Sequence, residues 1–506
     1  MDSQDLVSSA IFLYTVTTTT KAKDWRSRFI FGDAFNCILI AVVAAATRLM
    51  FFGWPAQMVF DEIYSGNFFS AYARGTFFFD VHPPLARLLI YFWGFMTGAP
   101  ATGLDSLKIG SAIPQSFVDI RLLPILAGVL LPVVIYGICR ALKFSKISSL
   151  TVGLLIGLEN SLIVQSRLVL TDVLLLLFGF SAILFYLWSR YINQQGTKHA
   201  WWGNGRVLTW LSAIMAAASA SIKWTGLAFL ACILCYEVFR LFVIPWIERA
   251  RLSFWSNVWK LCKTSLFYVL TLIVFYVAVF ALHFALLPRS GPGDPFMKPQ
   301  FQMTLVGNAN AGNAKLHPEG FFNKFFELNH EMFTANNSLP PTADYASKWY
   351  TWPFMIRGIF YWQGNAQYIY LLGNPLIYWL GTASIFMLLE YCLRLFVRHR
   401  PDQNERPVWK YWTLAIILAG FLINYLPFIF IGRVMFLYHY EAALIFSLIA
   451  IGFAIEMVPK GKWRLGAAIV LICLSFAFYR YFSPLIYGTH LTDKELQARM
   501  WLPSWR

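Results

Sequence analysis

The chain has 506 residues, of which 58% are hydrophobic and 18% aromatic but only 13% charged. A soluble domain carries about 25% charged residues, so this composition excludes an ordinary soluble globular protein and a disordered chain. The formal net charge of +16 does not indicate a nucleic-acid binder, because in so apolar a chain the excess belongs to cytoplasmic loops beside anionic lipid. We therefore expect a multi-pass membrane protein with no nucleic-acid partner.

Residues 1–33 precede the first apolar segment and are expected to be cytoplasmic. We do not expect them to be a signal peptide, because they start acidic and their apolar stretch is short and broken by threonines. Lysine and arginine are denser in the short loops on this side of the membrane than in the long loops opposite. This bias places the N-terminus inside and the C-terminal tail, residues 483–506, outside.

Eleven segments approach the 20 or so mostly apolar residues that a membrane-spanning helix needs. They are 34–52, 118–139, 148–165, 168–189, 207–222, 225–247, 264–287, 373–393, 411–430, 434–457 and 465–482. We expect an all-α polytopic protein with about 11 transmembrane helices, the first seven within residues 34–287 and the last four within 373–482. Between them lie two outer segments, 53–117 and 288–372, that are too long to be connectors, and long loops are usually functional.

Two adjacent carboxylates, Asp61 and Glu62, follow the first span inside an aromatic run. One interpretation is a solvated helix start, because Asp favours the N-cap and Glu suits the first turn of a helix. The other is a general base at the membrane surface, whose pKa burial among aromatic rings would raise toward a useful value. Both readings remain open from the pattern alone.

The rest of the first outer loop predicts an interfacial helix and a second short apolar segment that lies at the interface or re-enters the membrane. Residues 63–75 have helical apolar spacing with polar breaks, as an interfacial helix has. The prolines that follow His82 then force a turn, and residues 85–97 are apolar but too short to span. His82 itself is a ligand, a base or a structural turn residue.

A series of motifs, in a fixed order along the chain, resembles the protein O-mannosyltransferase family. The motifs are Phe60-Asp61-Glu62, Tyr72-x-Arg74-Gly75 through Asp80-Val81-His82-Pro83-Pro84, Arg121-Leu-Leu-Pro124, Ser166-Arg167-Leu-x-x-x-Asp172, Lys223-Trp224-Thr225-Gly226, His283-Phe284 through Ser290-Gly291-x-Gly293-Asp294, Trp352-Pro353 through Gly373-Asn374-Pro375, Gly432-Arg433-Val434-x-x-x-Tyr438-His439-Tyr440, and Phe482-Ser483-Pro484-Leu485. The resemblance covers nearly the whole chain from about Arg26. It implies a C-type glycosyltransferase (GT-C) fold with interfacial helices in the first outer loop.

One departure from the family concerns the second long loop. Eukaryotic members carry a large β-trefoil MIR domain there, whereas residues 288–372 leave no room for three trefoil repeats. The chain therefore resembles a short form that lacks the MIR domain. That architecture favours a bacterial inner membrane, with the active site outside and the endoplasmic reticulum membrane as the alternative, and the oligomeric state stays open.

The resemblance implies transfer of mannose, with inversion, from a polyprenyl (dolichyl-type) phosphate mannose donor to Ser or Thr hydroxyls of proteins. Such a reaction needs a carboxylate to take the hydroxyl proton and cations to meet the charge on the leaving lipid phosphate. Asp61 fits the base, and Glu62 is the second residue of the catalytic pair, orienting the acceptor or pairing with an arginine. No metal site and no cofactor other than the lipid-linked donor are predicted.

The remaining site residues are assigned by the side of the reaction that they face. Arg121, His283, Arg433 and His439 are expected to bind the phosphate or sugar of the donor, and His82 and Trp352 the acceptor. Each has a plainer alternative. Arg121 could snorkel to the interface or bridge to the acidic pair, the intramembrane histidines could join helices by hydrogen bonds, and Trp352 could belong to an aromatic belt.

Two other functions share some of these features. A related lipid-sugar-dependent glycosyltransferase acting on a lipid or glycan would have the same spans and the same acidic pair. A transporter or flippase would have to explain the acidic pair and two long outer loops. Asn336-Asn337-Ser338 is a glycosylation sequon on the outer side, and its use would require the endoplasmic reticulum.

Overall fold

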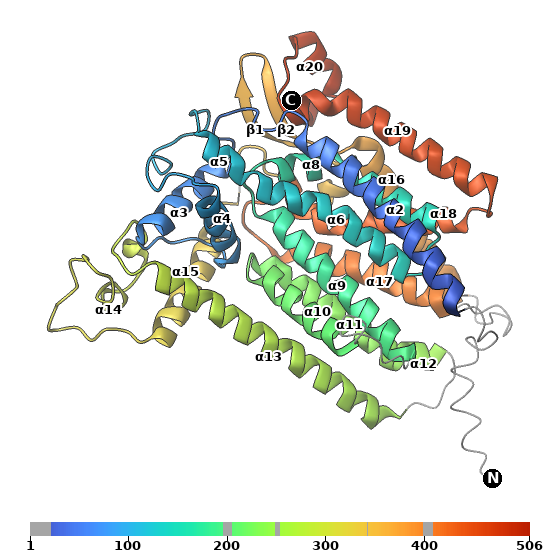
Figure 1. The fold of residues 1–506 in the computed structure, drawn as a ribbon, viewed down its shortest axis with the longest axis horizontal. Helices are drawn as coiled ribbons and strands as arrows, with labels where there is room; N and C mark the ends of the chain where they lie inside the picture. The colour runs from blue at the N-terminus through green and yellow to red at the C-terminus, as the bar shows by residue number, and fades with distance from the viewer. Residues whose placement is uncertain (1–21, 196–204, 248–252, 342, 398–407) are drawn as a thin grey trace.

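The computed structural model describes residues 22–195, 205–247, 253–341, 343–397 and 408–506. It is a bundle of long helices with short elements gathered at one end (Figure 1). Up to the second long loop the elements are α2 (Ala22–Leu49), α3 (Glu62–Arg74), α4 (Leu85–Met96), α5 (Gln115–Ile120), α6 (Leu122–Ala141), α7 (Lys146–Gly157), α8 (Asn160–Arg167), α9 (Asp172–Gln195), α10 (Gly205–Ala220), η2 (Trp224–Gly226), α11 (Leu227–Val238), η3 (Phe239–Val243), α12 (Ile244–Ile247) and α13 (Phe254–Leu286). The later elements are η4 (Asp294–Phe296), α14 (Pro299–Gln302), α15 (Phe321–Ser338), η5 (Trp349–Phe354), β1 (Ile359–Gly364), β2 (Gln367–Leu371), α16 (Pro375–Val397), α17 (Val408–Tyr425), η7 (Leu426–Phe430), η8 (Leu437–Tyr440), α18 (Glu441–Met457), α19 (Lys462–Tyr487), α20 (Asp493–Arg499) and η9 (Pro503–Trp505).

Nine helical segments in the described ranges are long and apolar enough to cross a membrane. The pair α7 and α8, bent by 55°, makes a tenth if it is one span. The expected span at 207–222 corresponds to α10, whose 16 residues fall short of the roughly 20 that a crossing needs. The all-α polytopic class is therefore confirmed, while the count of eleven stays a prediction.

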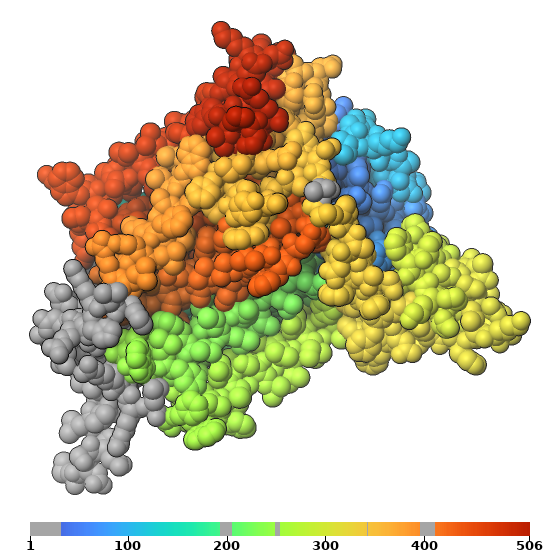
Figure 2. Space-filling view, turned by 180° about the vertical axis from the view of Figure 1, so that it is seen from behind, coloured from blue at the N-terminus to red at the C-terminus, as the bar shows by residue number. Residues whose placement is uncertain are grey.

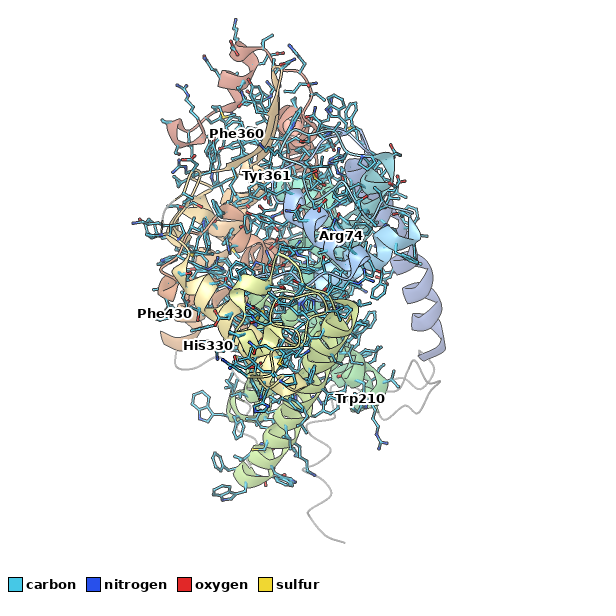
Figure 3. The ribbon with its side chains drawn as sticks, turned by 90° about the vertical axis from the view of Figure 1, so that its left-hand side faces the viewer. Arg74, Trp210, His330, Phe360, Tyr361 and Phe430 are labelled. Atoms are coloured by element: carbon cyan, nitrogen blue, oxygen red, sulfur yellow. The ribbon has the colours of Figure 1, made fainter. Side chains whose placement is uncertain are left out.

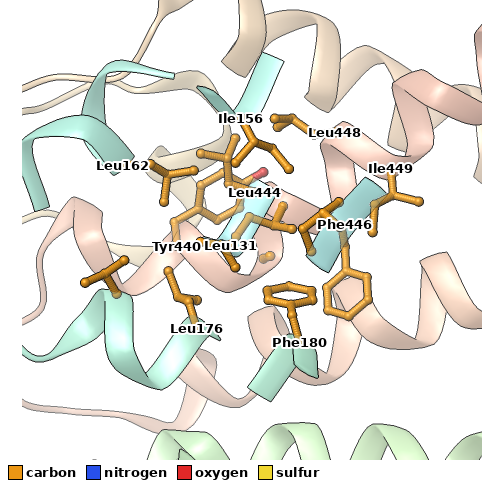
Figure 4. Close-up of a cluster of buried hydrophobic side chains, with 14 of the residues drawn as sticks. Leu131, Ile156, Leu162, Leu176, Phe180, Tyr440, Leu444, Phe446, Leu448 and Ile449 are labelled. Carbon is orange, nitrogen blue, oxygen red and sulfur yellow. The ribbon is translucent and has the colours of Figure 1, made fainter. Parts of the chain in front are cut away.

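Helix α18 lies at the centre of the bundle. It packs against α16, α17 and α7, and leucine, isoleucine and phenylalanine side chains bury every side of it. A helix that is apolar all round is a buried helix. Figure 4 shows part of this core, with Phe180 from α9 beside Leu444 and Phe446 from α18. Because α18 begins at Glu441, this central helix places its first residue beneath the outer loops.

The two long outer loops lie side by side at one end of the bundle. Arg289 forms isolated β-bridges with both Thr76 and Val306, and the Phe77 N–H donates to the Arg289 carbonyl at 2.8 Å. The contact needs glycine, because a Cβ at Gly291 would lie 2.2 Å from the Phe77 carbonyl oxygen. Figure 2 shows the second loop, in yellow, against the first, in blue.

The short elements of the loops surround this junction. Helices α3 and α4 occupy the segments expected to be interfacial, and Gly75 ends α3 in a left-handed conformation with φ of 68°. The described residues of the second loop form the 18-residue helix α15, several shorter helices and one antiparallel hairpin, β1–β2, and contain no β-trefoil. The hairpin register is irregular between Phe360 and Trp362, which marks a β-bulge at Tyr361.

Candidate active site

A buried ion pair anchors the start of the first outer loop. The Glu62 and Arg121 side chains are 0% and 1% exposed, and the Arg121 Nε and Nη2 atoms donate to the two Glu62 oxygens at 2.8 and 2.7 Å. Arg121 also donates to the carbonyls of Pro55 and Gln57. The Glu62 oxygens accept two further bonds, from the backbone N–H groups of Val59 and Val169. This bidentate pair clamps residues 55–62 to the start of α6.

That geometry corrects two of the roles assigned from the sequence. Both Glu62 oxygens accept hydrogen bonds from protein donors, and the Arg121 guanidinium donates to Glu62 and to two backbone carbonyls. Neither group is free to contact a substrate. The structure supports the alternative in which Arg121 bridges to the acidic pair, and the bonds of Arg121 to Glu62, Pro55 and Gln57 hold this stretch of backbone in place.

The Asp61 carboxylate differs from that of Glu62 in its lack of hydrogen-bond partners among the described residues. Its side chain is half-buried, and none of the hydrogen bonds or ion pairs found in the described residues involves its carboxylate. Burial raises the pKa of Asp61 to about 6, with Lys223 and Arg87 opposing that rise. Phe60, just before it, holds a left-handed φ of 47° and stacks on Tyr361 with ring centroids 4.0 Å apart. A strained residue beside an unpartnered carboxylate is typical of a functional site.

Two ion pairs flank Asp61. Lys223 donates to both oxygens of Asp172 at 2.7 and 2.8 Å, and Arg87 Nε donates to Asp80 at 2.8 Å. Each pair is nearly neutral as a unit, so neither pair neutralises the Asp61 carboxylate.

Arg433 is a further cation of the site. It is half-buried, and in the described ranges its guanidinium has no carboxylate within ion-pair distance. Burial lowers its pKa from the usual arginine value, yet a guanidinium stays charged at neutral pH. The positive charge of Arg433 interacts electrostatically with His82, as the charges of Lys223 and Arg87 also do. The site therefore combines a free base with a free cation.

The three histidines take different places. Burial and the cations Lys223, Arg87 and Arg433 hold the pKa of His82 well below its usual value, so His82 is neutral at the edge of the site. His439 stacks on Tyr438 at 4.5 Å and is electrostatically close to His82. His283 lies deeper, with its Nδ1 atom 2.7 Å from the Tyr72 hydroxyl.

His82 and His283 line one small pocket, together with Asp80 and Arg87. Lys223 interacts electrostatically with Asp61, His82 and His439, and Arg433 interacts with both histidines, so these residues lie in one neighbourhood. His283 stands behind them, where its bond to Tyr72 joins α13 to α3.

Trp352 does not face this space. Its side chain is 0% exposed, its indole N–H donates to Ser347, and its ring stacks beneath His439 at 6.0 Å. An acceptor peptide could not reach it, so the acceptor-side role expected for Trp352 is corrected to support of His439.

The sequon at Asn336 is also buried. The side chain is 9% exposed, and its Nδ2 atom donates to the carbonyls of Val81 and Met332 at 2.6 and 2.9 Å. Asn336 therefore fixes the backbone beside His82.

Sequence reasoning gave no role to Asp172, Lys223 or Tyr361, although the first two stand in the motifs quoted above. For Asp172 and Lys223 the signal available was position, because each follows a short outer turn or the outer end of a helix, whereas no such signal marks Tyr361 within the second long loop. In the described parts of the chain, no group of three or more His, Cys, Asp or Glu side chains is arranged to hold a metal ion.

Comparison with known families matches most of the chain. Residues 38–288 match the family described as dolichyl-phosphate-mannose-protein mannosyltransferase. Residues 321–505 match the C-terminal four-span region of protein-O-mannosyltransferase. The chain belongs to the protein O-mannosyltransferase family. It is therefore a membrane-embedded glycosyltransferase.

Individual relatives agree with this assignment. Dolichyl-phosphate-mannose--protein mannosyltransferase 1 of Saccharomyces cerevisiae is 23% identical over 684 residues, covering 92% of this chain and 82% of the relative. That alignment is longer than the chain, so the yeast member of the mannosyltransferase family carries insertions. Protein O-mannosyltransferase 1 of Drosophila melanogaster is 32% identical over 54% of the chain and 30% of its own length.

Solved structures show the same architecture. The S. cerevisiae protein O-mannosyltransferase Pmt1-Pmt2 complex bound to the sugar donor has a TM-score of 0.84 at 20% identity, covering 99% of this chain and 94% of that one. The Archaeoglobus fulgidus oligosaccharyltransferase AglB, in complex with an inhibitory peptide and a dolichol-phosphate, has a TM-score of 0.51 at 12% identity, covering 96% and 58%. The GT-C fold expected for a mannosyltransferase is thereby confirmed.

Proposed function

We propose that the chain transfers mannose from a polyprenyl or dolichyl phosphate mannose to Ser or Thr hydroxyls of proteins at the outer or luminal face, with inversion. The observation that carries the proposal is the unpartnered Asp61 carboxylate, with a pKa raised to about 6, in one neighbourhood with the unmatched guanidinium of Arg433. A base and a cation are the two groups that this transfer needs.

The step itself balances without further reagents. The acceptor hydroxyl attacks C1 of mannose, its proton passes to Asp61, and the bond from C1 to the phosphate oxygen breaks. The lipid monophosphate leaves with one more negative charge than it had as a diester. Arg433 meets that charge, and the fixed position of this cation lowers the cost of forming it.

Arg433 provides a test of the donor side. We expect Arg433→Ala to raise the KM for the lipid donor and to lower kcat, because the guanidinium would contact the phosphate in the ground state and more strongly as it leaves. Charge-assisted hydrogen bonds are worth about 1.5–3 kcal/mol, so kcat/KM should fall by roughly 10- to 150-fold. Lys348→Ala, which removes an exposed lysine of the second outer loop, should leave donor kinetics unchanged. A normal donor KM and kcat in Arg433→Ala would remove Arg433 from the site.

The pH profile tests the base. Because Asp61 must be deprotonated to accept a proton, kcat/KM should rise with pH through about 6 and then level off. Below that pH the rate should fall about tenfold per unit as the carboxylate is neutralised. The residual activity of Asp61→Asn should be flat over the same range, and an identical acid limb in this variant would assign the titration to another group.

One assay separates the proposal from its rivals. Membranes containing the protein are treated with labelled polyprenyl-phosphate-mannose and a Ser/Thr-rich peptide. Labelled peptide supports the proposal, whereas labelled lipid or glycan would support a related transferase with a different acceptor. The absence of any product, with donor and peptide both intact, would favour a transporter.

The membrane in which the protein resides stays a prediction. The relatives described above come from yeast and fly and do not support the bacterial inner membrane over the endoplasmic reticulum. In either location the proposal requires the loops that carry Asp61 and Arg433 to face away from the cytoplasm.

A further inference from the structure

Tyr361 carries a hydroxyl group that no protein atom satisfies. The side chain is 2% exposed, and in the described residues its hydroxyl has no hydrogen-bond partner. Its position at the bulge of β1 lets both Tyr361 and Trp362 bury their side chains, and bulges beside active sites often re-aim a side chain in this way. Tyr361 lies where the hairpin meets the helical body (Figure 3). A buried hydroxyl left without a partner requires an explanation.

Glu441 presents the same feature in stronger form. It is 1% exposed, and neither carboxyl oxygen has a partner in the part of the chain that the structure describes. Other buried glutamates differ. Glu62 accepts four hydrogen bonds, and Glu159 accepts bonds from Ser161, Leu162 and Asn374. Burying a carboxyl group without hydrogen bonds is costly, so Glu441 is kept for a partner that the protein alone does not supply.

Tyr361 and Glu441 lie near each other and near Asp61, the proposed base. The ionisable groups that interact electrostatically with the Tyr361 hydroxyl are Tyr438, Glu441, Asp61 and Asp172. The Tyr361 ring also stacks on Phe60, directly before Asp61. The unpartnered groups therefore converge between Asp61 and the first turn of α18.

The charges there indicate what kind of ligand fits. Asp61, Asp172 and Glu441 are all acidic side chains, and the Asp172 charge is already matched by Lys223. Such a space disfavours an anion, so the lipid phosphate belongs on the Arg433 side. It suits a neutral group with several hydroxyls, which can donate to carboxyl oxygens and accept from a phenol.

We infer that Tyr361 and Glu441 form the subsite that binds the hydroxyl groups of the transferred sugar and so determine which sugar is accepted. The inference rests on the proposed function and adds residues that touch the sugar rather than the phosphate or the acceptor. A site built to hydrogen-bond a hydroxyl discriminates strongly against a ligand that lacks or misplaces it.

The test compares two lipids on the purified full-length protein, polyprenyl-phosphate-mannose and polyprenyl phosphate without sugar. Tyr361→Phe and Glu441→Gln should each weaken binding of the mannose lipid roughly tenfold, the scale of one lost hydrogen bond. Binding of the sugar-free lipid should not change. Tyr368→Phe, on the other strand of the hairpin and partly exposed, is the control and should leave both affinities as they are.

A second readout guards against a merely structural effect. Because each variant removes or weakens an unsatisfied buried polar group, its melting temperature without lipid should equal or exceed that of the parent. Equal losses for the two lipids, or unchanged mannose-lipid binding in both variants, would overturn the subsite. A parent protein that binds the two lipids equally and transfers no mannose would instead overturn the proposed function.

Discussion

Asp61→Asn is expected to reduce mannosyl transfer by roughly 10²- to 10⁴-fold, the scale of a lost general base. The amide keeps the shape of the carboxylate but cannot take the proton of the acceptor hydroxyl. No protein hydrogen bond to this carboxylate exists in the described residues to be broken, so folding should be intact. The measurement is initial rate against donor concentration on purified protein, with lipid-donor binding measured in parallel and expected to stay within a few-fold.

Asp105→Asn is the matched control for that variant. Asp105 lies in the same outer loop, where it forms a partly exposed ion pair with Arg74, and its loss should leave the rate near that of the parent. Near-normal turnover in Asp61→Asn would remove the base assignment. Since Glu62 is fully occupied by Arg121, Asp172 or Glu441 would then be examined next.

Glu62→Ala is expected to destabilise the protein by about 3–5 kcal/mol, because it leaves the Arg121 guanidinium buried and unpaired. Residues 55–62 would lose their clamp, and the position of Asp61 would be lost with it. Thermal melting of the protein in detergent should therefore fall clearly, and activity should disappear at every donor concentration. Arg121→Ala should behave in the same way, because it leaves the Glu62 carboxylate buried and unpaired.

The exposed ion pair between Arg74 and Asp105, in the same loop, provides the control for this result. Arg74→Ala breaks an ion pair whose side chains are 33% and 37% exposed, and such pairs contribute about 0–1 kcal/mol. Its melting temperature should barely change. If Arg121→Ala melted like the parent and regained activity with excess donor, Arg121 would contact the donor phosphate, as the sequence first suggested.

The fold class and the position of the acidic pair after the first span could be predicted from the sequence for physical reasons. Apolar runs of about 20 residues leave few alternatives to spanning helices, and an acidic pair directly after a span marks a place at the membrane surface where a base could lie. The sequence could not say which of Asp61 and Glu62 is free. That distinction depends on Arg121, whose partner is settled only when α3 packs against the start of α6.

The remaining site residues were hidden for a different reason. Trp352 and Tyr361 are both aromatic residues of the second loop, and no local sequence pattern distinguishes them. In the structure, Trp352 is buried beneath His439, whereas a β-bulge redirects the side chain of Tyr361. Glu441 reads as an acidic first-turn residue of a helix. Only its burial without partners, visible once α18 is seen at the centre of the bundle, distinguishes it.

The buried side chain of Asn336 has a consequence for how the chain matures. Both N–H groups of its amide are committed to the carbonyls of Val81 and Met332, so the finished protein offers no nitrogen for a glycan to be attached to. Any sugar at this sequon would have to arrive before α15 docks on the first outer loop, and once attached it would keep the two loops apart. A glycan at Asn336 would therefore mark molecules that had failed to assemble the active site, and its absence would accompany those that had succeeded.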